Sequence, residues 1–100
     1  YYKQFAYLLQ KLDSVPEGAS GETLLDHTVV LWVKNLGYKH SWNQMLYMVA
    51  GGSAGILPQQ GRYLSFNGEP HNKLLAALSN KLGVSVTGFG DPDFSGTVAL

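Results

Sequence analysis

Residues 24–52 read LLDHTVVLWVKNLGYKHSWNQMLYMVAGG, and this stretch decides the predicted fold. Two apolar runs, residues 29–33 and 45–50, bracket a polar loop. Unbroken runs rich in β-branched side chains are typical of strands buried on both faces, and such strands belong to parallel, helix-covered sheets. Ligands of open α/β sheets bind just past the carboxyl ends of the strands. We therefore expect functional residues in the loop that follows Val33.

Apolar spacing predicts one helix on each side of this stretch. The first covers residues 2–15 and ends before Pro16, because the residue before a proline avoids the α-helical region. The second begins at Pro70 and ends at Gly83, which suits a left-handed residue, with Val84 folding back on the last turn. The apolar stripes of the two helices consist of Phe5, Leu8, Leu9 and Leu12, and of Leu74, Leu75, Leu78 and Leu82.

The connecting segments are predicted as loops and short strands. Residues 16–22 are expected to form a flexible loop, residues 56–60 an irregular segment, and residues 88–100 a mostly irregular tail. Residues 62–66 and 84–86 are candidate short strands. Residues 51–55 are small and permit a close approach of another backbone; they lack the spacing of a nucleophile elbow or a phosphate loop. Residues 34–44 show no helical stripe for a crossover, so we predict that the two main strands are not neighbours.

Composition limits the classes of partner. The 100 residues carry 7 basic and 7 acidic side chains, and this balance argues against nucleic acid as a partner. Charged residues make up 14% of the chain, against about 25% in ordinary soluble domains, which indicates a surface partly covered by other protein. Cysteine is absent, which rules out disulfides and thiolate sites. No apolar run reaches the length of about 20 residues that a membrane-spanning helix needs.

A set of short motifs carries a family resemblance. The motifs are TLLDHTVVLW at residues 23–32, LG at 36–37, HS at 40–41, AGG at 50–52, GR at 61–62, LGV at 82–84 and FGD at 89–91. In order and spacing they resemble the C-terminal end of a family of exported bacterial proteins of unknown function. That family usually carries twin-arginine signals and distantly resembles the alkaline phosphatase/sulfatase superfamily.

The resemblance implies a fold and a location. Residues 1–100 would be a single C-terminal segment of a larger α/β domain, with a mainly parallel, helix-covered, alkaline-phosphatase-like sheet that is incomplete on its own. The protein would be extracytoplasmic, in the periplasm or at the cell surface. Its partners would be other protein chains or an upstream part of the same chain.

The resemblance also points to a degraded metal site. Where the superfamily has an Asp-His-Gly motif that binds a divalent metal, this sequence has Asn35 and Leu36 ahead of Gly37. The exported family's His-Ser-His segment appears here as His40, Ser41 and Trp42. Hard cations need carboxylates and zinc prefers imidazole or thiolate, so His40 and Asn35 are the only candidate metal positions. The sequence predicts no definite cofactor, and a bound divalent metal is kept as an alternative.

Other candidate residues have a structural and a functional interpretation. His40 is either a general base or a loop histidine, and the lack of a neighbouring carboxylate favours the second. Asp26 and His27 are either an acid/base pair or, as we prefer, a turn cap beside a surface histidine. His71 is expected on a helix face. Because aromatic side chains are enriched in interfaces, the predicted partner contacts are Trp42, Tyr38 and Asn43.

Three functions follow from these observations. The preferred one is a non-catalytic structural or interaction subunit of an extracytoplasmic assembly, built on a degenerate hydrolase-like fold. The alternative is a metal-dependent phosphate or sulfate ester hydrolase whose nucleophile and main ligands lie upstream. A domain that binds a small ligand is the third. Fold resemblance alone does not establish an activity, which is why the first is preferred.

Overall fold

A computed structural model describes residues 1–57 and 59–100. Its regular elements are α1 (Tyr2–Asp13), β1 (Val30–Trp32), β2 (Met48–Ala50) and α2 (His71–Lys81). Four short 3-10 turns complete the described part: η1 (Leu24–His27), η2 (Tyr38–His40), η3 (Ser53–Gly55) and η4 (Pro92–Phe94). The predicted irregular segment 56–60 includes Pro58, which lies outside the described residues.

The sheet corrects the predicted fold. β1 and β2 pair with each other and run antiparallel, with Val30 opposite Ala50 and Trp32 opposite Met48. The prediction of a mainly parallel, helix-covered sheet was therefore wrong, as was the prediction that the two strands are not neighbours. The physical reason lies in residues 33–47. They contain no helix that could serve as a crossover, and the chain reverses direction in a hairpin instead.

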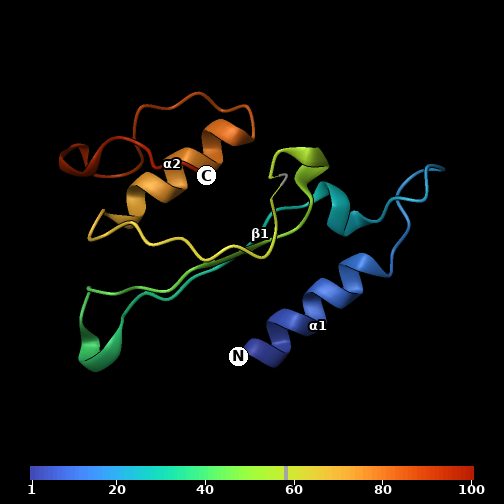
Figure 1. The fold of residues 1–100 in the computed structure, drawn as a ribbon, viewed down its shortest axis with the longest axis horizontal. Helices are drawn as coiled ribbons and strands as arrows, with labels where there is room; N and C mark the ends of the chain where they lie inside the picture. Colours follow the sequence, from blue (N-terminus) through green and yellow to red (C-terminus); the bar gives the residue numbers. More distant parts are fainter. Residues whose placement is uncertain (58) are drawn as a thin grey trace.

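Each face of the hairpin lies towards one helix. Leu31 and Val49 pack against a buried cluster that includes Leu74 and Leu78 of α2. Side chains alternate between the faces of a strand, so Trp32 points the other way. Its ring lies 5.5 Å from that of Tyr2 in α1. Figure 1 shows the hairpin running between the two helices, which explains why its apolar runs are unbroken.

α2 holds the centre of the core and ends as predicted. Its buried residues are Leu74, Ala76, Ala77 and Leu78. At the C-terminus, the Val84 N–H donates to the Ser79 carbonyl at 2.9 Å and the Gly83 N–H donates to the Asn80 carbonyl at 3.1 Å. Gly83 has a φ of +87°. This is a Schellman motif, and it confirms the predicted roles of Gly83 and Val84. The helix begins one residue later than predicted, with Pro70 as its N-cap.

α1 covers its side of the hairpin loosely. None of its residues is buried, and its predicted stripe is only half-buried or, at Leu8, exposed. The whole chain exposes 7384 Å², whereas a monomeric protein of this mass exposes about 5,600 Å². The radius of gyration is 14.9 Å, compared with about 13 Å for an ordinary domain of this length. The chain therefore leaves an unusual share of its surface open.

Two predicted strands are irregular in the structure. Residues 62–66 run beside the hairpin in Figure 1 without forming a strand. Residues 84–86 form hydrogen bonds with a side chain and not with a neighbouring strand. The Asn80 Nδ2 donates to the Val86 carbonyl, and the Val86 N–H donates to the Asn80 Oδ1. Residues 88–100 contain only η4. No helix in the described part of the chain is long and apolar enough to cross a bilayer.

Candidate functional site

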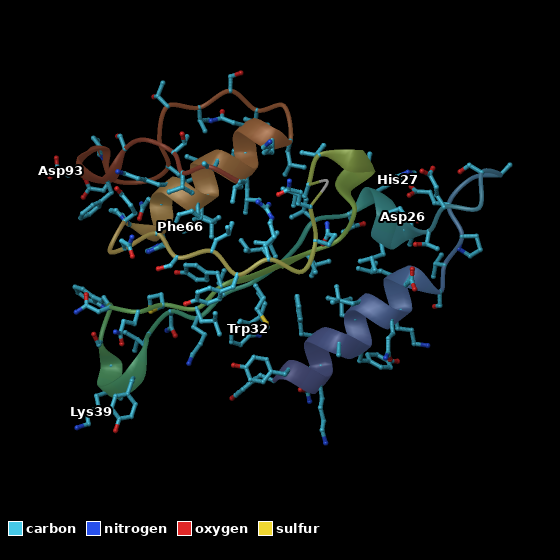
Figure 2. All side chains as sticks on the ribbon, viewed as in Figure 1. Asp26, His27, Trp32, Lys39, Phe66 and Asp93 are labelled. Atoms are coloured by element: carbon cyan, nitrogen blue, oxygen red, sulfur yellow. The ribbon has the colours of Figure 1, made fainter. Side chains whose placement is uncertain are left out.

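The loop between β1 and β2 carries most of the predicted site residues. Lys39, His40 and Gln44 have positive φ angles of 54°, 60° and 54°. Each left-handed residue that is not glycine costs about 1–2 kcal/mol. A hydrogen bond closes the tip of the loop around η2, since the Gly37 N–H donates to the Ser41 carbonyl at 2.7 Å. Figure 2 places Lys39 at the tip of this hairpin loop. Backbone strain of this kind is concentrated at functional sites.

The predicted partner-contact residues are all on the surface of this loop. The side chains of Tyr38 and Trp42 are 82% and 83% exposed. Asn43 is also exposed, and its N–H donates to the Ser41 Oγ at 3.0 Å. The ammonium group of Lys39 lies 5.5 Å from the centre of the Tyr38 ring. The loop therefore presents two aromatic rings to solvent from a backbone held by internal hydrogen bonds.

A pocket of about 420 Å³ lies between this loop and α2. We call it the loop pocket, and its lining residues are Val33, Lys34, Asn35, Trp42, Met45, Tyr47, His71 and Leu75. Two of the predicted site residues, Asn35 and Trp42, line it. His40, Tyr38 and Asn43 do not. The structure thus divides the predicted site between the pocket and the exposed part of the loop.

Two residues that were not assigned a site role contribute to the loop pocket. The rings of Tyr47 and His71 lie 5.7 Å apart, one from the end of the loop and one from the first turn of α2. Burial raises the pKa of the Tyr47 phenol above its usual value. A tyrosine hydroxyl is protonated at neutral pH and can donate a hydrogen bond. His71 was predicted only as a helix-face residue, because its sequence neighbours give no sign of Tyr47.

The residues present do not fit a divalent metal. Asn35 supplies a neutral amide, and His40 lies outside the pocket that Asn35 lines. No acidic side chain lines that pocket. Within residues 1–57 and 59–100, no group of three or more His, Cys, Asp or Glu side chains could hold a metal ion. The candidate pair of Asn35 and His40 therefore lacks the carboxylates that hard cations require.

His27 is held by two carboxylates that the sequence did not connect with it. Its Nδ1 lies 2.6 Å from the Glu17 Oε2, and its Nε2 lies 3.1 Å from the Glu22 Oε2. The hydrogen bond to Glu17 is the main cause that raises the pKa of His27, and the charge of Glu22 adds to it. The two glutamates approach opposite ring nitrogens, so the three groups do not converge on one point. Figure 2 shows His27 beside the loop of residues 16–22.

Asp26 acts as a cap, as preferred from the sequence. Its Oδ2 accepts a hydrogen bond from the Thr23 N–H at 2.7 Å, at the start of η1. Asp26 and His27 therefore have separate partners, which supports the structural interpretation of both residues.

The glycine segment after β2 is a backbone contact. A Cβ atom on Gly51 would lie 1.9 Å from the carbonyl oxygen of Thr28, and one on Gly52 would lie 2.8 Å from that of Asp26. The Gly52 N–H also donates to the Leu25 carbonyl at 3.0 Å. These glycines let η3 pack against η1, and the predicted close approach of another backbone is confirmed.

Comparisons of the chain with protein-family models, with curated proteins and with solved structures found no match. The resemblance to the exported family therefore remains a prediction, and the fold that it implied differs from the observed hairpin.

Proposed function

We propose that this chain is a non-catalytic interaction module that docks on another protein through the loop between β1 and β2. The observation that carries this proposal is the exposure of Tyr38 and Trp42, at 82% and 83%, on an ordered loop. Tyrosine and tryptophan supply large contact areas at a low cost in side-chain entropy, and they are enriched in the centres of protein interfaces.

The rest of the surface supports the same function. Besides Tyr38 and Trp42, thirteen large hydrophobic side chains are exposed in the described residues, three of them on α1. Burying one side chain of this size contributes about 1.5–3 kcal/mol before the entropy cost of association is subtracted. Formal net charge is zero, so association would depend on apolar contact rather than on long-range attraction.

No observation favours the alternative hydrolase function, because the Asn35 and His40 positions do not form a metal site. The extracytoplasmic location remains a prediction that depends on the family resemblance.

Site-specific photo-crosslinking in the native cell tests the proposal. A benzophenone amino acid would replace Trp42, Tyr38 or Tyr63 in turn. Tyr63 is the matched control, since it is an aromatic residue with 85% exposure outside the loop. We expect one discrete adduct at positions 42 and 38 and a much weaker one at position 63. Absence of adducts at 42 and 38, or equal yields at all three positions, would overturn the proposal.

A further inference from the structure

The loop pocket has a polar rim and an apolar floor. Lys34, Asn35, Trp42 and His71 are exposed, whereas Met45, Tyr47 and Leu75 are half-buried. Its volume of about 420 Å³ lies within the range of about 300–1,000 Å³ that is usual for small-molecule sites. Such sites combine mainly apolar walls with a few polar groups that orient the ligand, and the loop pocket has this composition.

The charge of the rim selects one sign of ligand. Lys34 is the one lining residue with a permanent charge, and no acidic residue lines the pocket. His71 is the first residue of α2, where the helix dipole adds positive potential. A cation would therefore be repelled. A ligand with several phosphates would find only one lysine to neutralise it, so a single anionic group fits best.

The polar groups of the rim are free to take a ligand. Among the described residues, neither the Lys34 ammonium nor the Asn35 amide makes a hydrogen bond or an ion pair with another residue. In the floor, the Tyr47 hydroxyl also makes no hydrogen bond with another described residue. These groups supply donors for an anion, while the rings of Trp42 and Tyr47 supply flat surfaces for stacking.

We propose that the loop pocket binds a small, planar aromatic molecule that carries one anionic group, such as a carboxylate. The ring system occupies the apolar floor with Met45, Tyr47 and Leu75, and the anionic group lies at the rim with Lys34 and Asn35. This site goes beyond the proposed docking function, because it takes a small molecule in the pocket, whereas docking uses the exposed face of the loop; Trp42 belongs to both surfaces.

Two ligands of matched shape test the proposal, with 2-naphthoate as the anionic probe and 2-naphthylmethanol as its neutral counterpart. Binding to the 100-residue chain would be followed by NMR titration of the backbone amides. We expect saturable shifts confined to the lining residues, and an affinity for 2-naphthoate about fivefold above that for the alcohol, as one exposed ion pair supplies.

Matched lysine variants identify the source of this preference. Lys34→Gln should abolish the fivefold difference, whereas Lys39→Gln, in the same loop but outside the lining, should retain it. Lack of saturation, shifts spread over the surface, equal affinity for the two probes, or an equal loss in both variants would each overturn the proposal. Photo-crosslinking at Tyr38, which does not line the pocket, would still report on docking, so the two proposals fail separately.

Discussion

Substitution of Gly51 by alanine tests the backbone contact between η1 and η3 most directly. Gly51 has a φ of +104°, and an added Cβ would lie 1.9 Å from the Thr28 carbonyl oxygen. The chain offers two matched glycines. Gly55 has a φ of +84° with nothing within 4 Å of an added Cβ, whereas Gly52 has an ordinary φ with the Asp26 carbonyl oxygen at 2.8 Å. The three positions therefore separate backbone strain from steric overlap.

The expected losses in the free energy of unfolding follow from these terms. Gly55→Ala should lower the free energy of unfolding by about 1 kcal/mol. A left-handed alanine costs about 1–2 kcal/mol, and alanine offsets part of this cost because it reduces the conformational entropy of the unfolded chain. Gly52→Ala should cost about 1–3 kcal/mol through overlap alone. Gly51→Ala combines both terms with a deeper overlap, for about 3–5 kcal/mol. Domains of this length have a stability of about 5–15 kcal/mol, so Gly51→Ala should come close to unfolding the chain.

Urea denaturation followed by tryptophan fluorescence measures these differences. Trp32 contacts α1 through Tyr2 and reports on the fold, whereas Trp42 is already exposed. The order of stability should be Gly55→Ala, then Gly52→Ala, then Gly51→Ala. If Gly51→Ala were no less stable than Gly55→Ala, the close approach of the two backbones would be refuted.

Three further changes test other contacts. Gly83→Ala should lower the free energy of unfolding by about 1 kcal/mol, because Gly83 has a φ of +87° with free space around it; an unchanged urea midpoint would contradict the Schellman cap. NMR titration should give His27 a pKa above the usual 6.5, and Glu17→Gln should lower that pKa. The sign follows from the raised pKa: stabilisation by His27 is complete below pH 6.5 and is lost as pH rises through the folded-state pKa, and an unshifted pKa would show that the contacts do not form in solution. Val49→Ile should raise the free energy of unfolding by about 0.5–1 kcal/mol, because the added methyl group fills part of an open pocket of about 150 Å³ that Val49 lines. A thermal melt showing lower stability would indicate that the pocket does not accept the methyl group.

Local signals in the sequence were the most reliable guides. Gly83 and Val84 were recognised because a left-handed residue after a helix has few alternatives to glycine. Gly51 and Gly52 were recognised as a close backbone contact for a similar reason, since only glycine leaves room for another chain segment. These features depend on a few neighbouring residues, and the structure places them as expected.

The direction of the strands could not be predicted in the same way. An apolar run reports burial on both faces of a strand, and the hairpin satisfies this with Leu31 on the side of α2 and Trp32 on the side of α1. Parallel and antiparallel strands can share this pattern when a helix lies on each face. The absence of a helical stripe in residues 34–44 was the one signal of a direct reversal.

Most of the candidate site depends on contacts between distant residues. The sequence identified Asn35 and Trp42, but nothing local connects Tyr47 with His71 across the loop pocket. The hydrogen bond between Glu17 and His27 was missed for the same reason, since the two residues meet only after the intervening loop folds back.

The loose packing of α1 on the hairpin has a thermodynamic consequence. A native chain that already exposes 7384 Å² has less new surface to expose on unfolding, about four-fifths of that of an ordinary protein of this mass. The urea m-value and the heat-capacity increment both scale with newly exposed area. Denaturation of the free chain should therefore be broad, and docking of a second protein on α1 and the hairpin loop should sharpen the transition as well as shift its midpoint.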